Sequence, residues 1–221
     1  MRHLLSTKRL SDGEIRQLEG AGWRIDQYDA ISIEFLKTEV APGDHLLIFT
    51  SKNAVTAFFK SFSNLNFSAC RSLCVGDGAA GMLTDKGVNV LEVFPSASQL
   101  AGSLGESYTG DSFVYYCGNL RLDLIPDTLD NLKLPWQEAP VYKTLLNPIK
   151  WDREYEAVVF FSPSAVRSYT GRNPMGEATG YCIGKTTSAE LSKYTHRIIC
   201  PKTPDRASLM DLLVRRENEL K

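Results

Sequence analysis

Short apolar runs alternate with amphipathic stretches along the whole chain. The runs are rich in β-branched and aromatic residues, as strands are, and the stretches between them have helical spacing. This alternation is typical of an α/β fold built on parallel sheets. We expect strands at residues 4–6, 24–28, 45–50, 72–75, 88–94, 112–116, 157–161, 181–183 and 197–200. We expect helices at residues 12–21, 53–61, 78–86, 98–107, 186–193 and 205–220, several of them after a residue that can cap the first turn.

Blocks in the second half of the chain repeat blocks of the first half in the same order. TSKNAV at 50–55 returns as FSPSAV at 161–166, CVGDGAA at 74–80 as CIGKTTS at 182–188, and VFP at 93–95 as ICP at 199–201. Because the offset stays at about 110 residues, a series of strand-turn-helix units is repeated and not one short motif. We therefore expect two similar lobes, with a cleft between them as the place of function.

Two extended segments have no counterpart in this repeat. They are AISIEFL at 30–36 and EAPVYKTL at 138–145. The first set of repeated blocks lies between them and the second set follows them, so we interpret them as the two chain crossings between lobes. The predicted fold is α/β, with two similar doubly wound parallel-sheet lobes joined by a two-stranded antiparallel hinge. Residues 1–36 with 141–221 form a discontinuous first lobe, into which the second lobe, 37–140, is inserted.

The composition excludes several classes of protein. A chain of 221 residues with 43% hydrophobic and 23% charged residues is ordinary for a globular protein and argues against disorder. Its longest apolar run, about five residues, is far below the roughly 20 of a membrane helix, and no signal-like segment opens the chain. We expect a cytoplasmic protein without a membrane. A net charge of −1 argues against nucleic acid as a partner.

The cysteines and histidines do not predict a metal site. The five cysteines contain no Cys-x-x-Cys pair, and four of them lie in or beside expected strands, where buried reduced thiols are the simple interpretation. The three histidines are scattered, without a second ligand at helical spacing. We expect no metal.

Each repeated block places small polar residues where a strand ends and a helix begins. Ligands of open α/β sheets bind at this edge, where the free N–H groups and the dipole of a helix favour anions. We expect a large ligand with several negative charges, although each Ser or Thr could instead be a plain helix cap. No phosphate-binding loop, dinucleotide fingerprint or nucleophile elbow is present, so these patterns leave catalysis open. The candidate binding residues are Thr50, Ser51, Asn53, Gly76, Gly118, Asn119, Ser162, Ser164, Gly184, Lys185, Thr186 and Thr187.

Motifs along nearly the whole chain keep the order and spacing of a known family. They are IFTSKNAV at 48–55, VG at 75–76, CGNLR at 117–121 followed by LIP at 124–126, VYKT at 141–144, FSPSAV at 161–166 and IGKTT at 183–187. In these motifs the chain resembles the uroporphyrinogen-III synthase family. Its members are two-lobed lyases of tetrapyrrole (haem) biosynthesis that use no cofactor and no metal. They cyclise hydroxymethylbilane, a linear tetrapyrrole polycarboxylate, to uroporphyrinogen III with loss of water and inversion of the terminal pyrrole ring.

The resemblance implies roles for particular residues. Tyr142 matches the family's cleft tyrosine and would donate a hydrogen bond to the leaving hydroxyl, unless it is only a packed strand residue. Arg121 and Lys185 could each contact a substrate carboxylate, although an ion pair with Asp123 is an equal alternative for Arg121. Asp77 departs from the family pattern, and its charge would oppose a substrate carboxylate. We expect a monomer.

Other functions remain open from the sequence. Two similar α/β lobes around a hinge are also the plan of non-catalytic proteins that bind a small polyanion or sense an effector. A nucleotide-sugar transferase shares the plan too, but the chain has no Asp-x-Asp metal motif. Fold alone does not decide between them.

Overall fold

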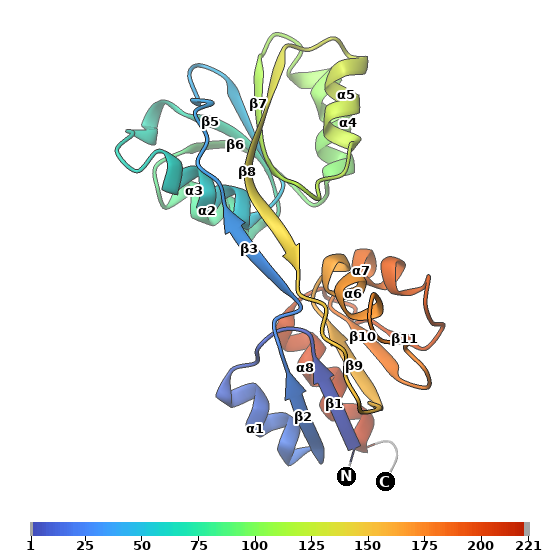
Figure 1. Cartoon of the computed structure of the whole chain (residues 1–221). Coiled ribbons are helices and arrows are strands. Elements are labelled where there is room, and N and C mark those ends of the chain that lie inside the picture. Colours follow the sequence, from blue (N-terminus) through green and yellow to red (C-terminus); the bar gives the residue numbers. More distant parts are fainter. Residues whose placement is uncertain (1, 219–221) are drawn as a thin grey trace. The chain divides into compact units, whose positions relative to one another are not determined.

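The computed structural model describes residues 2–218 of the chain. These residues divide into two compact units (Figure 1). The first unit comprises the chain up to Ser32 and from Leu145 onward, and the second comprises Ile33–Thr144. The sequence predicts these borders near residues 36 and 140. The expected C-terminal helix ends at Asn218, and its last two expected residues lie outside the described part of the chain.

The second unit is built on a six-stranded sheet. Its strands, in sheet order, are β3 (Ile31–Phe35), β8 (Trp136–Leu146), β7 (Phe113–Gly118), β4 (Leu46–Phe49), β5 (Arg71–Val75) and β6 (Asn89–Phe94). From β8 to β6 every neighbouring pair is parallel. One face is covered by α2 (Lys52–Ser61) and α3 (Asp77–Thr84), and the other by α4 (Ala97–Ser107) and α5 (Leu124–Asn131). A short 3₁₀ helix, η1, spans Phe67–Ala69.

The first unit is built on a five-stranded parallel sheet. Its strands, in sheet order, are β11 (Ile198–Ile199), β10 (Thr179–Cys182), β9 (Ala157–Phe160), β1 (Arg2–Ser6) and β2 (Trp23–Gln27). On one face lie α6 (Pro163–Thr170) and α7 (Lys185–Leu191), and on the other α1 (Asp12–Gly20) and α8 (Arg206–Asn218). Because both faces are covered, the central strands carry continuous apolar runs such as AVVF in β9.

The two sheets have the same strand order, and the repeat is therefore more complete than the sequence indicates. The order β6-β5-β4-β7-β8 of the second unit corresponds to β11-β10-β9-β1-β2 of the first. The N-terminal segment β1-α1-β2 is thus the counterpart of β7-α5-β8. The expectation that 138–145 has no counterpart is wrong, because the first part of β8 pairs in parallel with β7 and takes the position that β2 takes in the first unit.

The strand β3 is the addition to this plan. It is the hydrogen-bonded neighbour of β8, and the two arrows run in opposite directions (Figure 1). Beyond the end of β3, the Leu36 N–H donates to the Val141 carbonyl at 2.8 Å. The predicted α/β fold is confirmed, including the two-stranded antiparallel link at the chain crossings.

Local signals explain why helices begin where they do. Ser11, Ser51, Ser96 and Ser162 have extended backbones, and each accepts a hydrogen bond from the N–H three residues on. α6, which was absent from the expected helices, also has Pro163 in its first turn, a position where proline costs no hydrogen bond. Among residues 2–218 no helix has the length and apolar character that crossing a membrane requires.

Candidate active site

The polar residues predicted in the second unit lie at one edge of its sheet. β7, β4 and β5 are parallel neighbours, so their carboxyl ends meet at the same edge. Thr50 and Ser51 follow β4, Gly76 follows β5, and Gly118 ends β7. β8 pairs with β7 and brings Tyr142 opposite Gly118. The sheet topology therefore gathers residues that are distant in sequence.

Ser51 and Tyr142 are joined by a hydrogen bond. The Ser51 hydroxyl oxygen accepts the Ala54 N–H at 3.1 Å, and the hydroxyl donates to the Tyr142 oxygen at 3.0 Å. Burial raises the pKa of Tyr142, although the bond from Ser51 lowers it. The phenol is therefore protonated at neutral pH, as a hydrogen-bond donor must be.

Gly118 fixes the place of the Tyr142 ring. A Cβ atom at Gly118 would lie 2.3 Å from Cζ of Tyr142, so only glycine admits the ring there. The Asn119 N–H donates to the Tyr142 carbonyl at 3.2 Å, and the Asn119 side-chain oxygen accepts the Thr144 N–H at 2.8 Å. Gly118 thus leaves room for the tyrosine ring, and Asn119 binds the backbone around it.

Thr50 is paired with a second tyrosine. Its hydroxyl lies 3.0 Å from the hydroxyl of Tyr115, which is only 2% exposed. Burial raises the pKa of Tyr115 to about 12. The sequence does not reveal Tyr115 as a member of this group, because a strand tyrosine is usually a packing residue.

Arg121 is held by acidic residues of its own unit. Its Nε and Nη2 donate to the two oxygens of Glu138 at 2.5 and 3.0 Å, and Nη1 donates to Asp123 at 2.5 Å. Hydrogen bonds from Arg121, against the effect of burial, keep the pKa of Glu138 below its usual value. This arrangement fits the ion-pair alternative, with Glu138 as a partner that the sequence did not reveal.

The start of α3 lies on a glycine with a positive φ. Gly76 has a φ of 83°, a conformation that favours glycine, and α3 has no side-chain cap. The Gly76 N–H donates to the Phe94 carbonyl at 2.9 Å. Lys52 lies across Gly78, since a Cβ atom there would be 2.1 Å from the lysine Cε. Lys52 thus brings a cation to this helix start, beside Asp77. It belongs to the TSKN motif but is not one of the candidate binding residues. Asn53, which is a candidate, is half-buried in the first turn of α2.

In the first unit the predicted residues also lie at the carboxyl edge of the sheet. Ser162 follows β9 and accepts the Ala165 N–H at 3.1 Å. The Ser164 hydroxyl accepts a hydrogen bond from Arg167 at 3.3 Å. Gly184 follows β10 and is buried, with Lys185 and Thr186 exposed after it.

Thr187 is 1% exposed, with its side chain in the interior of the first unit. It is four residues before the buried Leu191, and residues at this spacing share one face of a helix. In this conformation the side chain is therefore closed to a ligand, and its binding role stays a prediction.

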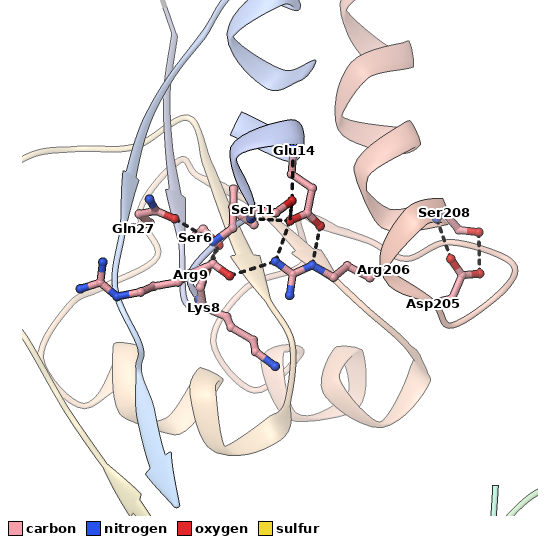
Figure 2. A network of polar contacts seen from close by, with 10 residues as sticks. Ser6, Lys8, Arg9, Ser11, Glu14, Gln27, Asp205, Arg206 and Ser208 are labelled. Carbon is pink, nitrogen blue, oxygen red and sulfur yellow. Dashed lines mark hydrogen bonds and ion pairs between the residues drawn. The ribbon is translucent and has the colours of Figure 1, made fainter. Parts of the chain in front are cut away.

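A further group at this edge follows the end of β1, and Figure 2 shows two of its residues, Lys8 and Arg9. The Thr7 N–H and hydroxyl both donate to the Val159 carbonyl, at 3.0 and 2.7 Å. Lys8 and Arg9 follow and are exposed. This segment is the counterpart of Gly118–Asn119 in the strand order of the other unit. In the sequence, this group could have been recognised from the polar and basic run STKR that directly follows the apolar residues of β1.

Comparisons with known proteins decide the family. The family model for uroporphyrinogen-III synthase HemD matches residues 14–211, most of both units. The chain belongs to the uroporphyrinogen-III synthase family. The resemblance seen in the sequence motifs is therefore confirmed, and with it the class of enzyme, a cyclising lyase of haem biosynthesis.

Solved structures of uroporphyrinogen-III synthases have the same fold. The enzyme of Helicobacter pylori has a TM-score of 0.74 at 16% identity, with 98% of this chain and 100% of that chain covered. A mutant enzyme of Thermus thermophilus has a TM-score of 0.72 at 13% identity, with both chains fully covered at 100%. At these identities the likeness shows the fold alone. A search of curated proteins found no match.

The family's chemistry is consistent with the groups at the two edges. Within residues 2–218 no three His, Cys, Asp or Glu side chains lie together as metal ligands. The edges offer hydroxyls, helix starts and backbone N–H groups, which suit carboxylates. Tyr142 adds a phenol that can donate a hydrogen bond but gives up its proton only weakly.

Proposed function

We propose that this protein is a uroporphyrinogen-III synthase that cyclises hydroxymethylbilane to uroporphyrinogen III. The observation that carries the proposal is the family match over residues 14–211, since it covers most of both units and not one motif. The edges of the two sheets support it, because each presents polar groups suited to the carboxylates of a linear tetrapyrrole.

The substrate supplies most of the reactivity. The electron-rich pyrrole that bears the hydroxymethyl group expels its hydroxyl, which takes up a proton and leaves as water. The resulting azafulvene cation is attacked by a carbon of the last pyrrole ring, and the free carbon of that ring loses a proton when the macrocycle closes. The number of protons is therefore conserved over the reaction. Without an enzyme the cation closes to the unrotated isomer. The protein's task is to hold the substrate so that the last ring reacts at the carbon that already bears its bridging methylene, which gives a spiro intermediate. The original bond to that methylene then breaks, and the methylene rejoins the ring at its free carbon, so the ring is inverted.

Tyr142 is the residue that we assign to the leaving hydroxyl. Its raised pKa keeps the phenol protonated, and its ring is fixed over Gly118. A phenol of this kind assists departure of the hydroxyl by a hydrogen bond more than by full proton transfer. Geometry is the larger part of catalysis in this proposal.

The carboxylates would be bound by the remaining candidates. Lys185 and Thr186 are exposed at the edge of the first unit, and Ser162 and Ser164 lie at the start of α6. In the second unit Gly76, Gly118 and Asn119 would act through the backbone, beside Thr50 and Asn53. Arg121 is the weakest member of the set, because its guanidinium is already bound to Glu138 and Asp123.

One assay tests the function directly. Freshly made hydroxymethylbilane is supplied to the protein, and the oxidised products are separated by isomer. We expect a clear excess of type III over type I without added metal or cofactor. A mixture equal to that of a protein-free control would contradict the proposal and favour the alternative, a non-catalytic protein that binds polyanions. Light scattering of the same preparation tests the proposed monomer, and localisation of the tagged protein tests the proposed cytoplasmic compartment.

A further inference from the structure

The hydroxyl of Ser51 has its hydrogen-bonding capacity divided between two partners. A serine hydroxyl has one proton to donate and can accept through its lone pairs. The Ala54 N–H at 3.1 Å points at the oxygen, and the proton is directed to the Tyr142 oxygen at 3.0 Å. The helix cap therefore uses one lone pair of the Ser51 oxygen and holds the side chain in place, while its proton faces the tyrosine.

Tyr142 differs from Tyr116 and Tyr155 in how its own proton is used. Tyr116 donates to the Val40 carbonyl at 2.7 Å, and Tyr155 donates to Asp26 at 2.9 Å. Tyr142 instead accepts, and among the described residues no acceptor for its own proton is found. Its proton is therefore available to a group outside the protein.

We infer that Ser51 is a positioning residue, which holds the Tyr142 oxygen as an acceptor so that the phenol proton is presented to the leaving hydroxyl of the substrate. Ser51 itself does not touch the substrate in this arrangement. The inference rests on the proposed function, and it changes the role of Ser51 from the predicted binding of a carboxylate. Gly118 also helps to position Tyr142, because only a glycine leaves room for the tyrosine ring there.

A double-mutant cycle separates the two roles of Ser51. The single variants are Ser51→Ala and Tyr142→Phe, and the double variant combines them. We expect Ser51→Ala to lower kcat about tenfold, roughly the effect of one hydrogen bond, with KM little changed. In the Tyr142→Phe background the same change should have no further effect, since the group that Ser51 positions is gone.

Matched control variants separate an effect on kcat from a loss of stability at the helix cap. Ser51→Thr keeps both hydrogen bonds and should restore kcat to within about twofold of wild type. Ser96→Ala removes the corresponding cap of α4, at a site with no role in the reaction, and should lose stability but not kcat. The ¹³Cζ resonance of Tyr142 gives a readout without catalysis, because loss of the Ser51 bond should raise the pKa at which it titrates.

Three results would overturn the inference. They are a higher KM with unchanged kcat in Ser51→Ala, an equal loss of kcat in both backgrounds, or a Tyr142 titration that does not respond to Ser51→Ala. A wild-type protein that gives no excess of type III product would instead refute the proposed function. The two failures are therefore distinguishable.

Discussion

The two units share their packing but differ in their polar pairs. Phe49 and Phe58 meet edge to face at 5.3 Å and 68° in the second unit, and Phe160 and Tyr169 meet at 5.7 Å and 69° in the first. Each pair joins the first repeated strand to the helix that follows it. The duplicated sequence has therefore kept the same aromatic contact in both cores.

The hydroxyls after these strands are where the units diverge. Ser51 bonds to Tyr142, whereas Ser162 makes only its cap bond among the residues described. In the first unit Tyr28 follows β2, the counterpart of β8, but its hydroxyl is buried against Trp151 without a hydrogen-bond partner in that part of the chain. Close packing has kept the apolar contacts similar in both units, whereas the hydroxyls after the strands have different partners. We infer that chemistry resides in the second unit and that the first serves binding.

The largest effect that we predict concerns the aromatic pair itself. Phe58 contacts four further rings, those of Phe59, Phe62, Phe67 and Tyr116, at centroid distances of 4.8 to 5.4 Å. Phe58→Ala should lower the free energy of unfolding of the second unit by about 3–5 kcal/mol. Hydrogen exchange resolved by peptide measures each unit separately.

Tyr169→Ala is the matched variant in the first unit. Its ring contact is with Phe160, and it lies beside the 470 Å³ cavity lined also by Trp151 and Tyr155, so the loss should be smaller, about 2–3 kcal/mol. Equal losses in the two units would mean that the additional rings around Phe58 contribute nothing to stability.

The next effect concerns the two tyrosines. Tyr142→Phe should lower kcat by about a hundredfold, the lower end of what acid assistance contributes, without abolishing the reaction. Tyr28→Phe should leave kcat unchanged and leave stability equal or higher, because it removes a buried hydroxyl that has no partner among the described residues. Steady-state turnover of hydroxymethylbilane measures both. Unchanged kinetics in Tyr142→Phe would remove Tyr142 from the mechanism and erase the difference between the units.

The sequence predicted the units better than it predicted their contacts. The repeat and the helix caps are local signals, and they placed most strands and helices within a few residues. The N-terminal part of the repeat stayed hidden, because β1 is paired with β9 across about 150 residues of chain and no motif marks that pairing.

For the candidate site, too, the residues could be predicted from the sequence better than their contacts. Ser51 and Tyr142 are each recognisable by motif, but their hydrogen bond depends on how β8 is aligned with β7. For Arg121 the nearby Asp123 was considered and Glu138, 17 residues away, was not. The burial of Thr187 could have been predicted from its spacing to Leu191. Contacts that depend on sheet register could not be predicted from one sequence, whereas contacts within one helix could be.

The smallest effect that we predict concerns an ion pair that packs α8 onto α1 in the first unit. Arg206 donates to both oxygens of Glu14, which also closes a capping box with Ser11 (Figure 2). Burial alone would raise the pKa of Glu14, but the bonds from Arg206 and Ser11 lower it to about 2. The pKa in the folded protein lies below the unfolded value, so this stabilisation is complete above about pH 4.5 and is lost as pH falls toward 2.

Glu14→Gln removes the charge and keeps the capping box, since Gln serves equally at that position. We expect it to lower the free energy of unfolding of the first unit by about 1–2 kcal/mol at pH 7, because Arg206 is partly exposed to solvent. The difference from wild type should shrink as pH falls from 4.5 to 2, as measured by urea unfolding at each pH. The stability of the second unit should not differ between Glu14→Gln and wild type at any pH. A difference in the free energy of unfolding that stays constant between pH 4.5 and 2 would show that Glu14 contributes through packing and not through charge.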